Sequence, residues 1–90
     1  MQIDDLAIRI REFVVTNFYV AHPESLDDRA SLLRAGIVDS TGLLELIGFL
    51  ESSWDLKVND DEIVPENLDG IGRIAAYVAR KTGREMDRVA

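Results

Sequence analysis

The sequence contains no cysteine. A disulfide framework, a cysteine-ligated metal site and an intrinsic thiol nucleophile are therefore excluded. No stretch of apolar residues is long enough for a membrane-spanning helix. The first residues, Met1 to Asp5, have neither the basic start nor the long apolar core of a signal peptide. We therefore expect a cytoplasmic protein that does not insert into a membrane.

Positive charge is also scarce. The 90 residues include 10 Lys and Arg against 17 Asp and Glu, which gives a formal net charge of −7. Nucleic acids and anionic membrane surfaces bind basic patches, so neither is an expected partner. An acidic protein favours partner enzymes with basic docking faces, approached under electrostatic steering. Because 47% of the residues are apolar, the chain can form one globular core.

Apolar residues recur at helical spacing in four stretches of the chain. These stretches predict helices over residues 3–18, 40–53, 60–64 and 68–82. Asn59 and Asn67 are expected to cap the third and fourth helices. Pro65 is expected to stop the third, and Gly83 to end the fourth. The sequence thus predicts an all-α, antiparallel four-helix bundle with three long helices and a short third one.

A long connection, residues 19–38, separates the first two helices. A loop of this length is often functional or contains a short helix of its own, for which residues 27–33 are the candidate. Gly36 suits a position with a positive φ. The loop is expected to be pinned to the core by Leu26, Leu32, Leu33 and Ile37. We expect a single domain over residues 1–83 and a flexible tail over residues 84–90.

The most informative stretch is the predicted start of the second helix. Asp39 and Ser40 are both good N-cap residues. The apolar residues Leu43, Leu46 and Leu50 then follow at helical spacing. Helical geometry places Ser40 about 60° from the centre of this stripe, so its hydroxyl should be reachable from water. A helix start also favours a phosphate through its unpaired amides and its dipole.

The segment from Gly36 to Glu51, G-I-V-D-S-T-G-L-L-E-L-I-G-F-L-E, resembles the modification site of the acyl carrier proteins. In that family a serine directly after an aspartate, at the start of the second helix, carries a 4′-phosphopantetheine arm. The resemblance extends from the first amphipathic stretch to about Lys81. It implies that Ser40 is the attachment site and that the arm comes from coenzyme A. The arm's thiol would then hold an acyl or aminoacyl group as a thioester.

The resemblance also implies the partners. They are a phosphopantetheinyl transferase, an acyl- or aminoacyl-activating ligase and downstream synthase or transferase enzymes. The protein itself would be a monomeric shuttle, with no catalytic residue and no metal. Thr41 and Gly42 follow Ser40, and Gly48 stands where many fatty-acid carriers have a bulky apolar residue. This departure favours a discrete carrier of a secondary-metabolite pathway, such as polyketide or nonribosomal peptide synthesis, over a standard fatty-acid synthase.

Partner enzymes are expected to recognise the surface around Ser40. The expected recognition residues are Asp39, Thr41, Leu44, Glu45, Gly48 and Glu51. Asp39 would both cap the helix and contact the transferase, and Glu45 would pair with basic residues of visiting enzymes. Glu51 lies nearer the buried side. Leu44 could cover the arm or its cargo, although the spacing favours core packing for it.

Two glycines inside the second helix are unexpected, because each costs about 0.8–1 kcal/mol relative to alanine. Three explanations are open for Gly42 and Gly48. The loop could pack closely against the helix, a partner could approach its backbone, or the glycines could result from neutral drift. The residues leave these readings open.

Two other classes of function are alternatives to the carrier. An unmodified helical module could use the acidic surface to bind a basic partner. A hydrolase using Ser40 is disfavoured, because the motif contains no general base and His22 is the single histidine. The acidic residues between Asp60 and Asp69 match the spacing of no calcium loop and are expected to serve helix starts and solubility.

Overall fold

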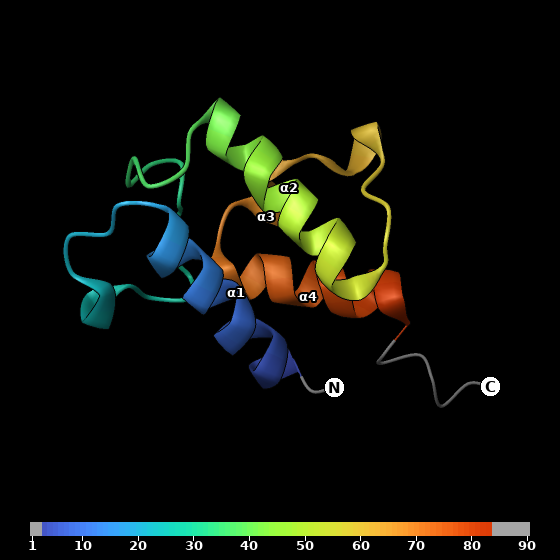
Figure 1. The fold of residues 1–90 in the computed structure, drawn as a ribbon, viewed down its shortest axis with the longest axis horizontal. Coiled ribbons are helices and arrows are strands. Elements are labelled where there is room, and N and C mark those ends of the chain that lie inside the picture. Colours follow the sequence, from blue (N-terminus) through green and yellow to red (C-terminus); the bar gives the residue numbers. More distant parts are fainter. Residues whose placement is uncertain (1–2, 84–90) are drawn as a thin grey trace.

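The computed structural model describes residues 3–83 (Figure 1). The tail expected over residues 84–90 lies outside this range. The elements in chain order are α1 (Ile3–Asn17), η1 (Pro23–Ser25), α2 (Ser40–Trp54), η2 (Asp60–Glu62), α3 (Pro65–Leu68) and α4 (Ile71–Thr82). Within the described residues all regular structure is helical, which confirms the predicted all-α bundle with three long helices and a short third α-helix. None of these helices is long and apolar enough to cross a membrane.

The core lies where α1, α2 and α4 meet. Leu6, Ile10 and Val14 of α1 are fully buried, because they recur at intervals of four residues on one face. The other helices bury Leu46, Ile47, Leu50, Leu68, Ile71, Ile74, Ala75, Tyr77, Val78 and Ala79. Burying one such aliphatic side chain stabilises the fold by about 1.5–3 kcal/mol. Figure 1 shows α1 and α2 running in opposite directions, as predicted.

The predicted helix boundaries are wrong between residues 59 and 71. The third predicted helix is only one 3-10 turn, η2, and Pro65 begins α3 rather than stopping a helix. Proline fits the first helical position because the amide it lacks would have no partner there. Asn67 does not cap the last helix. It lies inside α3, where its side chain donates to the Glu62 carbonyl (2.9 Å) and accepts from Arg80 (2.9 Å).

The last helix instead begins at Ile71, after Gly70. Gly70 has a φ of 148°, and a Cβ there would lie 3.2 Å from the Ala30 carbonyl oxygen. The close approach of the long loop therefore sets the start of α4. Its end agrees with the prediction, since Gly83 adopts a left-handed conformation with φ 73°.

The long loop between α1 and α2 is anchored by polar contacts rather than by a helix. The guanidinium of Arg11 donates to the Leu26 carbonyl (2.6 Å) and forms an ion pair with Asp28. The Gly72 amide donates to the Asp28 carbonyl (2.9 Å). The helix proposed for residues 27–33 is absent, because that segment forms hydrogen-bonded turns, and the only helical turn in the described loop is η1.

The apolar anchors of the loop agree with the prediction except at one position. Leu32 is buried, and Leu26 and Ile37 pack partly buried against the core. Leu33 is 44% exposed and therefore does not pin the loop to the core. Gly36 has the expected positive φ, 74°.

An aromatic cluster joins α1 to α2. The Phe49 ring stacks on the Phe13 ring with centroids 4.1 Å apart, and it meets Trp54 edge to face at 5.6 Å. The Arg9 guanidinium lies 4.7 Å from the Trp54 ring centroid. The Trp54 indole nitrogen is buried and has no hydrogen-bond partner among the described residues. This cluster orients the last turn of α2 against α1.

Candidate functional site

The start of α2 has the capped geometry that the sequence predicts. Asp39 is extended (φ −108°, ψ −171°), and its carboxylate accepts a hydrogen bond from the Gly42 amide at 2.8 Å. The Asp39 carbonyl accepts from the Leu43 amide at 2.8 Å. Ser40 is therefore the first residue of α2, and it is exposed. The predicted exposure of Ser40 is thus confirmed, and its modification stays a prediction.

Gly42 holds this helix start against the end of α1. A Cβ at Gly42 would lie 2.7 Å from Cε1 of Phe18, which is closer than real Cβ contacts. A side chain at position 42 would therefore force the Phe18 ring to move, so Gly42 allows the ring that follows α1 to pack closely on the helix start. The second glycine differs, because no atom lies within 4 Å of a Cβ placed at Gly48. Close packing by the loop consequently does not explain Gly48.

The outer face of α2 beside Ser40 is open. Its exposed residues are Thr41, Leu44, Glu45, Gly48 and Ser52. The core packing favoured for Leu44 is wrong, since this side chain is 69% exposed. Leu43, the first residue of the apolar stripe, is partly buried against the core. Leu44 then lies about 100° further around the helix and faces solvent.

Glu51 lies nearer the buried side, as expected, and it has a structural partner. Its carboxylate accepts a hydrogen bond from the Val58 amide at 2.9 Å. This contact ties the segment after α2 back onto the helix. Glu45, in contrast, makes no hydrogen bond or ion pair with any residue between 3 and 83. The recognition roles of these and the other outer residues stay predictions.

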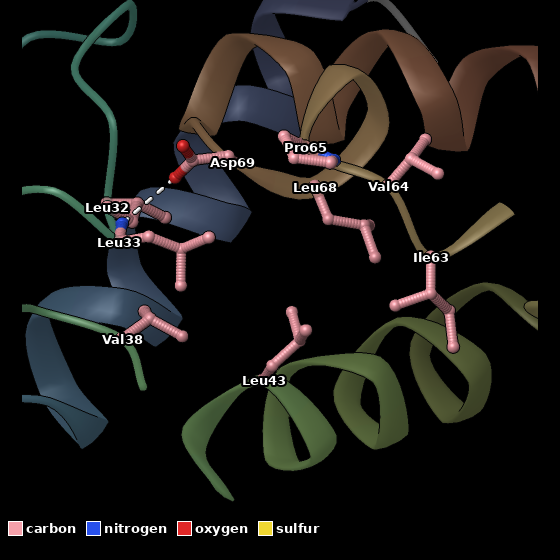
Figure 2. A pocket seen from close by; sticks show the side chains of 9 residues that line it. All are labelled: Leu32, Leu33, Val38, Leu43, Ile63, Val64, Pro65, Leu68 and Asp69. Atoms are coloured by element: carbon pink, nitrogen blue, oxygen red, sulfur yellow. Dashed lines mark hydrogen bonds between the residues drawn. The ribbon is translucent and has the colours of Figure 1, made fainter. Parts of the chain in front are cut away.

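A cavity of about 190 Å³ lies beside the start of α2 (Figure 2). Leu43 reaches into it from α2 and Val38 from the residues before the helix. The remaining wall is formed by Leu32, Leu33, Ile63, Val64, Pro65, Leu68 and Asp69. The cavity therefore lies between the long loop, α2 and α3, within one helical turn of Ser40.

Asp69 is the charged residue in the cavity wall, and both of its oxygens are occupied. One accepts from the Ser31 hydroxyl and the other from the Leu33 amide at 2.9 Å (Figure 2). The carboxylate thus holds the loop as a wall of the cavity, and the remaining lining is apolar. No local sequence pattern predicts this cavity, because its walls come from segments about 30 residues apart.

The perturbed ionisable groups lie away from Ser40. A hydrogen bond from the Asn59 amide, followed by one from Lys81, lowers the pKa of Glu62 from 4.5 to about 2. Burial, followed by the hydrogen bond to Glu62, raises the pKa of Tyr77 above its ordinary value. These groups join η2 to α4 and have a structural role. His22 lies in the exposed loop beside Glu24, with 3.9 Å between Nδ1 and Oε2.

The described residues form a small all-helical bundle compatible with the acyl carrier type, with an exposed serine at the start of its second long helix. No protein-family model matches the chain. Among characterised sequences, the chain is similar to the probable acyl carrier protein PigG of Serratia sp. (strain ATCC 39006). The two are 27% identical over 75 residues, which cover 83% of this chain and 86% of that protein.

This similarity supports the acyl carrier protein family for the chain, in agreement with the resemblance of residues 36–51. Acyl carrier proteins are carriers rather than enzymes. The name of this relative agrees with the prediction of a carrier rather than an enzyme.

Proposed function

We propose that the protein carries an acyl group as a thioester on a 4′-phosphopantetheine arm attached to Ser40. It presents this group to partner enzymes of a fatty-acid-like, polyketide or other secondary-metabolite pathway. The observation that carries the proposal is the position of Ser40. It is exposed, it is the first residue of α2, and the helix behind it is capped by Asp39.

The residues at the helix start fit a phosphodiester at Ser40. The first amides of a helix have no intrahelical acceptor and attract an anion, which lowers the cost of a phosphate there. Asp39 keeps its carboxylate on the Gly42 amide, so the negative charge beside Ser40 is already engaged. The arm supplies a thiol for thioester chemistry. The protein needs this because its sequence has no cysteine.

The cavity beside α2 suits the cargo. An apolar cavity of ~150 Å³ takes up benzene, so a cavity of about 190 Å³ has room for a compact apolar group slightly larger than that. Leu43 and Val38, on either side of Ser40, both line it. The apolar lining favours an acyl over an aminoacyl cargo. Apart from Asp69, whose carboxylate already holds the loop through Ser31 and Leu33, the lining side chains are apolar and would leave a buried polar group without a partner.

The partners of this carrier are a phosphopantetheinyl transferase, an activating ligase and downstream synthase or transferase enzymes. The surface that they contact consists of Asp39, Thr41, Leu44, Glu45 and Gly48, with Glu51 at its edge. Glu45 offers an unpaired charge to basic enzymes, and Leu44 offers an exposed apolar contact. We further propose that the carrier acts as a cytoplasmic monomer with one domain over residues 1–83.

Loading by a transferase tests the proposal. The purified protein is incubated with coenzyme A and a promiscuous phosphopantetheinyl transferase, and the intact mass is measured. The wild type should gain the mass of one phosphopantetheine, and Ser40→Ala should gain none. Ser52→Ala is the matched control, because Ser52 is exposed on the same helix and should leave loading unchanged.

Two results would contradict the carrier. A folded wild type that gains no mass would favour an unmodified acidic interaction module. A Ser40→Ala variant that is loaded as well as the wild type would show that the arm is attached elsewhere. An aminoacyl carrier is the remaining alternative. It would be indicated if an adenylating ligase charged the loaded protein with amino acids but not with carboxylic acids.

A further inference from the structure

A second hollow, of about 370 Å³, lies on the surface between the long loop, α3 and α4. Arg29 of the loop and Arg73 and Arg80 of α4 line it, and we call it the arginine hollow. The arginine hollow shares no lining residue with the cavity beside Ser40. None of the residues that line the arginine hollow belongs to α2. A partner bound there would leave Ser40 and the outer face of α2 free.

The three arginines carry charges that the fold does not neutralise. Arg73 donates to the Pro65 carbonyl at 3.3 Å, and Arg80 donates to the Asn67 side-chain oxygen at 2.9 Å. Both acceptors are neutral. Within residues 3–83, no carboxylate lies within 4.0 Å of a nitrogen of these arginines, since the ion pairs there involve other cations.

The acids that border the hollow do not cancel these charges. Asp28 is paired with Arg11, which leaves Glu66 as the remaining acid in the lining. Three arginines against Glu66 give an excess of two positive charges in a chain whose net charge is −7. Positive charge is therefore concentrated here on an otherwise acidic molecule.

Two of the arginines lie on the same face of α4, where one partner can contact both. Arg73 and Arg80 are seven residues apart, so they lie on one helix face about 10.5 Å apart along the axis. Ala76 lines the hollow between them, and its small side chain leaves room for an incoming group. The hydrogen bonds to Pro65 and Asn67 hold the guanidinium groups in place. Each guanidinium has five N–H donors, so several remain for a partner.

We propose that the arginine hollow docks an acidic helix of a partner protein, with two carboxylates seven residues apart facing Arg73 and Arg80. A guanidinium binds a carboxylate through two parallel hydrogen bonds, which matches this partner chemistry. A small free anion fits less well. The arginines are exposed, and a single exposed ion pair contributes little in water. An acidic helix engages several charges together and gains from electrostatic steering.

The test uses the full ¹⁵N-labelled protein and a helical alanine-based peptide with two glutamates seven residues apart. A second peptide of the same composition has its glutamates two residues apart, which places them on opposite helix faces. At low salt, the first peptide should shift the amide signals of Arg29, Ala76 and Arg80 and bind more tightly than the second. Arg73→Ala/Arg80→Ala should weaken the binding of the first peptide about tenfold, which corresponds to ~0.7 kcal/mol for each of two exposed ion pairs.

The matched control is Arg34→Ala/Lys57→Ala, which removes the same charge from exposed positions outside the hollow and should not change the affinity. Circular dichroism checks that each variant is folded, and Arg73→Gln/Arg80→Gln is used if the alanine variant is not. Ser40→Ala should bind the peptide as the wild type does, so this test fails or succeeds independently of the carrier proposal.

Four results would overturn the proposal. The first is an equal loss of affinity in both double variants, which would show general charge attraction. The second is identical shifts and affinity with inorganic phosphate alone, which would show a site for small anions. The third is a dimer in sedimentation that Arg73→Ala/Arg80→Ala dissociates, which would make a second copy of this chain the occupant. The fourth is the absence of shifts with either peptide.

Discussion

Adding one methyl group at each glycine of α2 should have opposite effects on stability. At Gly48 a Cβ meets no atom within 4 Å, so Gly48→Ala should recover the helical cost of glycine, about 0.8–1 kcal/mol. At Gly42 a Cβ would lie 2.7 Å from the Phe18 ring and 3.3 Å from the Asp39 carboxylate. Such overpacking costs about 1–3 kcal/mol, so Gly42→Ala should lose up to about 2 kcal/mol after the helical gain.

Urea unfolding followed by circular dichroism measures both effects. A domain of this size unfolds with a slope of about 1 kcal/mol per molar urea, so Gly48→Ala should raise the midpoint by about 0.8–1 M. Gly42→Ala should lower the midpoint without changing the slope. If Gly42→Ala stabilises the protein as much as Gly48→Ala, then Phe18 does not rest on this helix start. The close packing inferred between Gly42 and Phe18 would then be refuted.

The same variant tests why Gly48 is present. With loop packing ruled out, the approach of a partner and simple drift remain. We expect Gly48→Ala to slow the loading of Ser40 although the fold becomes more stable, because the added methyl group would separate the two surfaces. Unchanged loading kinetics would indicate drift.

Three further perturbations test the helix cap and the charges. Asp39→Ala should lose the hydrogen bond to the Gly42 amide and about 0.5–2 kcal/mol of stability in urea unfolding, whereas Asp39→Asn should retain most of it. The pKa of Glu62 is lowered in the folded state from 4.5 to about 2. The ionised Glu62 therefore contributes fully to the free energy of unfolding above pH 4.5, and this contribution is lost as the pH falls toward 2. The stability difference between wild type and Glu62→Gln in urea unfolding should shrink across that window. Added NaCl should raise the melting temperature in calorimetry by screening the acidic self-repulsion, and no change would mean that the charges are already paired.

The sequence predicted the start of α2 because its signals are local. Asp39 caps the helix through an amide three residues away, and the apolar stripe that follows has one clear phase. The end of α4 was equally predictable, since Gly83 supplies a backbone conformation that other residues avoid. In both places residues close together in the sequence determine the backbone geometry.

The segment from residue 59 to 71 could not be predicted in the same way, because its signals are ambiguous. Proline is suited both to follow a helix and to begin one, and here Pro65 begins α3. Asn67 is a common capping residue, yet Arg80 and the Glu62 carbonyl hold its side chain in a tertiary contact. The start of α4 depends on how closely the loop approaches Gly70, which no local pattern shows.

The two hollows were missed for the same reason. Leu32 and Val64 share the cavity beside Ser40 only after the chain has folded, and Arg29 meets Arg73 only because the loop is anchored on α4. The Asp69 carboxylate, which holds the loop in that position, appeared in the sequence as one of several acids near helix starts. Its partners are more than 30 residues away.

The aromatic cluster gives the protein an intrinsic fluorophore at a useful place. Trp54 is the single tryptophan and the last residue of α2, whereas Ser40 is the first. Fourteen residues of helix separate them by about 21 Å. Tryptophan emission therefore reports on the contact between α1 and α2 at the end of α2 that lies far from Ser40. A shift in that emission on loading would mean that the attachment end of the helix is mechanically coupled to its far end.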